Sequence, residues 1–151
     1  MRLTRFLRVL MALALALSWF FSAASISTTQ ASSVSVIVTT TGSTSYEQNR
    51  IIRLAKNLNL DSQPAMPEWW NIQIMSGQEF EAMLVQNGID GLTYSAVSFL
   101  GQGKTIVNED YLIFADDARV EQTLAHEAGH LICNCSSESK ANDIASVIIP
   151  K

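Results

Sequence analysis

Two histidines and a glutamate at fixed spacing constrain the fold of this chain more than any other feature. His126 and His130 are four residues apart, Glu127 directly follows the first, and the 151 residues contain no other histidine. Residues four apart lie one turn above each other on an α-helix, so both imidazoles can reach one ion. The His-Glu-x-x-His pattern on a helix is typical of zinc peptidases. We therefore expect Zn²⁺ at His126 and His130, with Glu127 as the catalytic general base.

The surrounding residues predict the helix that this motif needs. Asp116 and Asp117 supply an N-cap and a negative first turn for a helix that starts near Ala118. Its apolar side chains fall on one stripe, away from the two histidines: Val120, Leu124, Ala128 and Leu131. Gly129 is unfavourable inside a helix, so its presence predicts the close approach of a neighbouring backbone.

A catalytic zinc takes three protein ligands and keeps one position open, so the motif lacks one ligand. The candidates downstream are Cys133, Cys135, Glu138 and Asp143. The extended pattern that ends in a third histidine is excluded, because Ser136 stands at that position.

A helical hairpin would make Glu138 the third ligand. Residues 134–137 can form a turn, and residues 138–145 predict a second short helix. In an antiparallel hairpin Glu138 lies beside His130. Asn142, one turn further, then lies beside His126 and can orient its imidazole.

Two other interpretations of these residues stay open. Glu138 can be a solvated acid that the helix dipole favours at a first turn. Cys133 also lies on the ligand face and is an alternative ligand. In an oxidising compartment Cys133 and Cys135 can instead form disulfides, including bonds between molecules, since a bridge across a single residue is strained.

The order of the motifs in residues 91–150 is similar to that of a known family. The residues that carry the similarity are Leu124-Ala125-His126-Glu127-Ala128-Gly129-His130-Leu131, Glu138-x-x-Ala141-Asn142-x-x-Ala145 and Ile148-Ile149-Pro150. Together they resemble the ImmA/IrrE metallopeptidase family. The resemblance implies a zincin-like fold with a gluzincin-like site, in which His126, His130 and Glu138 hold zinc and Glu127 is the base.

The first 31 residues predict export. Arg2, Arg5 and Arg8 precede an apolar run from Val9 to Phe21, and small residues follow. This order is typical of a signal peptide, here 1–31, with cleavage after Ala24 or Ala31. The run is shorter than the roughly 20 residues of a membrane-spanning helix. We expect a secreted or periplasmic protein without a stable membrane span, and a membrane-tethered form with an uncleaved signal anchor is the alternative.

The rest of the chain predicts one α+β domain. Residues 32–45 are a Ser/Thr-rich spacer or a first strand, and 46–151 form the zincin-like metallopeptidase domain. Apolar periodicity and turn residues predict helices at 45–58, 76–87, 118–131 and 138–145, and strands at 70–75, 92–100, 104–107 and 111–114. We expect helices packed on a short, mostly antiparallel sheet, with the active-site helix followed by the short ligand helix.

Charge narrows the possible partners. Without the three N-terminal arginines, seven basic residues remain against fourteen acidic ones, so no nucleic-acid partner is expected. The expected partner is a peptide or protein substrate, bound as an added strand at the sheet edge. Tyr94, Tyr111 and Arg119 are candidates for stabilising the oxyanion of the reaction. The alternative function is a non-catalytic exported metal-binding or protein-interaction module.

Overall fold

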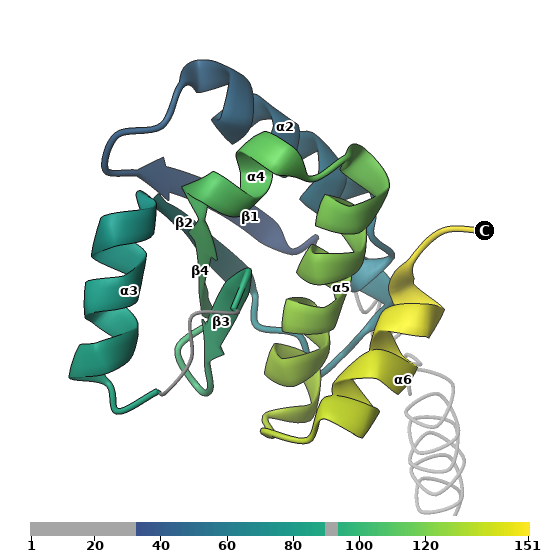
Figure 1. Cartoon of the computed structure of the whole chain (residues 1–151). Coiled ribbons are helices and arrows are strands. Elements are labelled where there is room, and N and C mark those ends of the chain that lie inside the picture. The colour runs from purple at the N-terminus through teal and green to yellow at the C-terminus, as the bar shows by residue number, and fades with distance from the viewer. Residues whose placement is uncertain (1–32, 90–93) are drawn as a thin grey trace, which may run out of the picture. The chain divides into compact units, whose positions relative to one another are not determined.

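The computed structural model describes residues 33–89 and 94–151, so the predicted signal peptide lies outside the described residues. The strands are β1 (Ser35–Thr40), β2 (Trp69–Met75), β3 (Ala96–Phe99) and β4 (Lys104–Asn108). The helices are α2 (Ser45–Asn57), α3 (Gly77–Gln86), α4 (Glu109–Phe114), α5 (Asp117–Cys133) and α6 (Glu138–Ile148), with a 3₁₀ turn, η1 (Leu60–Ser62). The expectation of an α+β fold is confirmed (Figure 1).

The sheet is mixed, and the expectation of a mostly antiparallel sheet was wrong. Its four strands have the order β1-β2-β4-β3. β1 pairs in parallel with β2, and β2 in parallel with β4, while only β3 and β4 form an antiparallel hairpin. The physical reason is that a helix follows each of the first two strands. α2 and α3 carry the chain back across the sheet, as parallel pairing requires.

Helices cover both faces of this sheet, and each face has its own core. Trp70, Ile72 and Ile74 of β2 are fully buried on one face, against apolar side chains of α2 and α5. Ile106 of β4 points to the other face, where it packs on Phe80 and Leu84 of α3. The sheet thus separates α3 from α5 (Figure 1).

Two further predictions about local structure are decided. Residues 35–40 form strand β1, so the strand interpretation of this segment holds over the spacer. Residues 111–114 were predicted as a strand, and this was wrong, because they belong to α4. The Asn108 side chain caps this helix by accepting a hydrogen bond from the Asp110 N–H at 2.9 Å.

Within residues 33–89 and 94–151, none of the helices has the length and apolar character needed to cross a membrane.

Candidate metal centre

Helix α5 carries the His-Glu-x-x-His motif with one side buried in the core. Its N-cap is Asp116, whose side chain accepts a hydrogen bond from the Arg119 N–H at 2.9 Å. The apolar stripe Val120, Leu124 and Ala128 is buried, as predicted. The helix ends at Asn134, whose positive φ of 45° lets the chain turn back into α6.

The contact between α5 and α6 is close at one point. A Cβ atom added to Gly129 would lie 2.5 Å from the carbonyl oxygen of Ala141 and 2.9 Å from its Cα. Gly129 predicted the close approach of a neighbouring backbone, and this backbone is that of α6. This hairpin brings Glu138 and Asn142 of α6 against His126 of the motif.

Three side chains converge at the hairpin. The Nε2 atoms of His126 and His130 are 3.1 Å apart. Glu138 places one carboxylate oxygen 3.0 Å from His126 Nε2 and the other 3.5 Å from His130 Nε2. Four ligands around a tetrahedral zinc at about 2.0–2.1 Å are separated by about 3.3 Å from one another. The spacing of these three groups suits such an ion.

Hydrogen bonds at the far sides of the two imidazoles select which ring nitrogen carries the proton of the neutral form. His130 Nδ1 lies 2.9 Å from the backbone oxygen of Cys135, which can only accept, so the Nδ1 carries the proton. His126 Nδ1 lies 2.9 Å from Asn142 Oδ1, which gives the same tautomer. Asn142 thus lies where the hairpin places it, beside His126.

The consequence is that three acceptors face one another. Both Nε2 atoms present lone pairs, and the Glu138 carboxylate offers no proton when ionised. Acceptors held 3.0–3.5 Å apart repel unless a cation or additional protons lie between them. Two imidazole nitrogens and a carboxylate are a common ligand set for catalytic zinc, so the donor set fits this metal.

Glu127 lies beside this cluster but is buried. Only 6% of the residue is exposed, and its Oε2 has no hydrogen-bond partner among the described residues. Burial raises the pKa of its carboxyl. A carboxylate with a raised pKa and an unused oxygen is suited to accept a proton at neutral pH.

A chain of hydroxyl groups fixes the backbone of Glu127 to the sheet. Ser98 Oγ donates to the Glu127 carbonyl oxygen at 3.2 Å, so Thr105 Oγ1, 2.8 Å from Ser98 Oγ, donates to Ser98. Trp70 Nε1 in turn donates to Thr105 Oγ1 at 2.8 Å. These contacts hold α5 against the β3–β4 hairpin at the motif.

A cleft of about 800 Å³ runs between strand β3 and helices α5 and α6. His126, Glu127, His130, Glu138 and Asn142 all line it.

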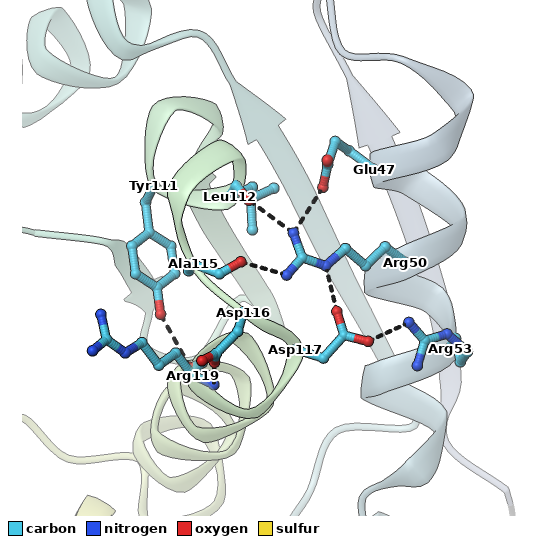
Figure 2. Close-up of polar contacts among 9 residues, drawn as sticks. All are labelled: Glu47, Arg50, Arg53, Tyr111, Leu112, Ala115, Asp116, Asp117 and Arg119. Atoms are coloured by element: carbon cyan, nitrogen blue, oxygen red, sulfur yellow. Dashed lines mark hydrogen bonds and ion pairs between the residues drawn. The ribbon is translucent and has the colours of Figure 1, made fainter.

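The three candidates for oxyanion stabilisation, Tyr94, Tyr111 and Arg119, also line the cleft. Figure 2 shows that the Tyr111 hydroxyl is already engaged, because it lies 3.0 Å from the Arg119 carbonyl oxygen. It also lies 2.8 Å from Thr123 Oγ1.

A buried arginine that the sequence analysis did not single out anchors the start of α5 (Figure 2). Arg50 of α2 donates to the carbonyl oxygens of Leu112 and Ala115 at 2.7 and 2.6 Å. Its Nε lies 2.7 Å from Asp117, which also pairs with Arg53. The signal in the sequence was its position next to Ile51, on the apolar side of α2.

The cysteines are joined to each other. Cys133 and Cys135 form a disulfide within the chain. The alternative of Cys133 as the third ligand fails, since its sulfur is bonded to Cys135 rather than available as a thiolate.

Comparisons of the chain with protein-family models, with characterised proteins and with solved structures found no match.

Proposed function

We propose that this protein is an exported zinc-dependent metallopeptidase, with His126, His130 and Glu138 as the metal ligands and Glu127 as the general base. The observation that carries the proposal is the convergence of three proton acceptors at 3.0–3.5 Å beside a buried carboxylate. This arrangement lies in a cleft of about 800 Å³, a volume within the range of ligand-binding sites.

The reaction that these residues support is hydrolysis of a peptide bond. A zinc ion, when bound, would supply Lewis-acid polarisation of the scissile carbonyl and make water more acidic. Glu127 accepts the proton of the attacking water through its unpaired oxygen and delivers it to the leaving nitrogen. The hydrogen bond from Ser98 to the Glu127 carbonyl oxygen, together with the helix, holds the backbone from which this side chain extends.

Strand β3 would bind the substrate. In its register with β4, the Asn108 N–H donates to the Ser95 carbonyl, so Ser95, Val97 and Phe99 direct their backbone groups toward β4. The N–H and C=O groups of Ala96 and Ser98 therefore point to the outer edge, beside the cleft. An extended peptide can pair there as an added strand, with its carbonyl near the three ligands.

The family and the compartment are part of the same proposal. The convergence of His126, His130 and Glu138 supports a zincin-like, gluzincin-like site, as the resemblance to the ImmA/IrrE metallopeptidases implies. The basic and apolar N-terminal order supports export. The protein recovered outside the cytoplasm should have the intact mass of a chain that begins at Ser25 or Ser32. An uncut chain in the membrane fraction would support the tethered form instead.

The decisive variant is Glu127→Gln, which keeps the size of the side chain but cannot accept the proton. We expect zinc content to stay at the wild-type level while cleavage of an unfolded protein substrate falls by about 10²–10⁴-fold. Unchanged turnover would remove Glu127 from the mechanism. A wild-type protein that binds zinc and cleaves nothing would instead support the non-catalytic metal-binding module.

A further inference from the structure

The disulfide lies directly against one of the proposed metal ligands. The chain has two cysteines: Cys133 is the last residue of α5, and Cys135 follows it two positions later. Their bond closes a small ring around Asn134, which has the left-handed conformation. This ring constrains the backbone of residues 133–135, where the turn between α5 and α6 begins.

The ring ends at the atom that orients His130. The Cys135 carbonyl oxygen accepts the Nδ1 proton of His130 at 2.9 Å, and the Cys135 N–H donates back to the His130 carbonyl oxygen at 3.3 Å. Cys133 Sγ lies 3.7 Å from the same Cys135 oxygen. The Cys135 carbonyl extends from the Cα of Cys135, which is a member of the disulfide ring, so the ring constrains the point from which this carbonyl reaches His130.

We propose that the Cys133–Cys135 disulfide positions His130 for metal binding and makes the metal affinity of the site dependent on oxidation of the two cysteines. The inference rests on the proposed metal centre. With the bond closed, the Cys135 carbonyl holds the proton on His130 Nδ1 and leaves the Nε2 lone pair for the ion. With the bond open, the turn gains conformational freedom, and the carbonyl no longer selects this tautomer.

The chemical step is thiol–disulfide exchange with a dithiol reductant. One thiolate of the reductant attacks a protein sulfur and forms a mixed disulfide, releasing the other cysteine as a thiol. The second thiol of the reductant then displaces the remaining cysteine. Two electrons and two protons pass to Cys133 and Cys135, and the reductant leaves as a cyclic disulfide.

This dependence agrees with the proposed export. Disulfides persist in secreted and periplasmic proteins and are kept reduced in the cytosol. The chain would therefore have a weak metal site during synthesis and complete the site only after it leaves the cytoplasm. Proteins of the cytoplasm would then be protected from its activity.

The test compares the oxidised wild-type protein with the double variant Cys133→Ser/Cys135→Ser. The matched control is Ser139→Ala, which changes an exposed residue in the first turn of α6. Zinc affinity is measured by chelator competition, and the tautomer of His130 by nitrogen NMR of the metal-free proteins. We expect the double variant to bind zinc about 10–100-fold more weakly and to lose the single Nδ1–H tautomer. The control should match the wild type in both measurements.

The outcomes separate this inference from the proposed function. Wild-type zinc affinity and an unchanged tautomer in the double variant would overturn the inference and leave the metal centre intact. So would recovery of the exported chain with both cysteines open to alkylation. An oxidised wild type that holds the Nδ1–H tautomer of His130 but binds no zinc would overturn the proposed function. In that case, loss of this tautomer in the double variant would still support the positioning role of the disulfide.

Discussion

Gly129→Ala tests whether the α5–α6 contact sets the geometry of the proposed metal centre. The added Cβ would lie 2.5 Å from Ala141 O, whereas ordinary contacts begin at 3.4 Å. The obstructing atoms belong to backbone, so side-chain rotation cannot relieve the overlap. Helix α6 would have to move away by about 0.9 Å. Ligand positions need to be held within about 0.5 Å, so this shift would displace Glu138 and Asn142 from the two histidines.

The two energetic effects of this substitution on folding partly cancel. Overpacking costs about 1–3 kcal/mol, and replacing glycine by alanine inside a helix gains about 1 kcal/mol. The free energy of unfolding should therefore fall by no more than about 2 kcal/mol. Zinc affinity is the more sensitive measurement, and we expect it to fall by at least about 10-fold.

Gly42→Ala is the matched control, because nothing lies within 4 Å of the added Cβ and the residue has no positive φ. Its zinc affinity should equal that of the wild type. Chelator competition gives the zinc affinities of the wild type and the two variants. Urea unfolding of the same three proteins without metal gives their free energies of unfolding. If Gly129→Ala raised stability and kept the wild-type affinity, the close contact with α6 and the argument built on it would be refuted.

The remaining predictions concern the ligand helix and the start of α5. Glu138→Ala should abolish tight zinc binding, and Asn142→Ala should weaken it by about 10–100-fold, as measured by competition with a chelator. Hydrogen bonds from Arg53 and Arg50 lower the pKa of Asp117. Its ion pairs therefore stabilise the fold above its unfolded pKa of about 3.9, and this stabilisation is lost as pH falls through the lower folded-state pKa. Urea unfolding should show Asp117→Asn less stable than the wild type near neutral pH and the two converging in acid, and a constant gap would contradict this.

The C-terminal hairpin was predictable because its signals are local. Three of these signals lie within or directly before α5 and predict its faces. They are the cap at Asp116, the apolar stripe, and Gly129, which is unfavourable inside a helix. The eight-residue step from His130 to Glu138 then predicts which side chains meet. Local sequence determines such a hairpin because few residues separate its partners.

The sheet was harder to predict because alternation does not reveal the partner of a strand. Residues 70–75 have the period of a half-buried strand, and this period is the same for parallel and antiparallel neighbours. The error at residues 111–114 has a similar cause, since a short apolar run suits a strand or a buried helix. Arg50 escaped notice because its partners, two backbone carbonyls and Asp117, come from residues more than sixty positions away.

The proximity of the proposed metal ligands along the chain also bears on the order of folding. His126 and Glu138 are twelve residues apart, whereas Ser35 of β1 pairs with Trp69 of β2 across 34 residues. Closing a short loop loses less entropy and is faster than forming a distant parallel pair. The α5–α6 hairpin can therefore assemble before the sheet, and an ion captured there would lower the barrier to folding rather than only stabilise the finished protein. In refolding experiments zinc should then increase the folding rate.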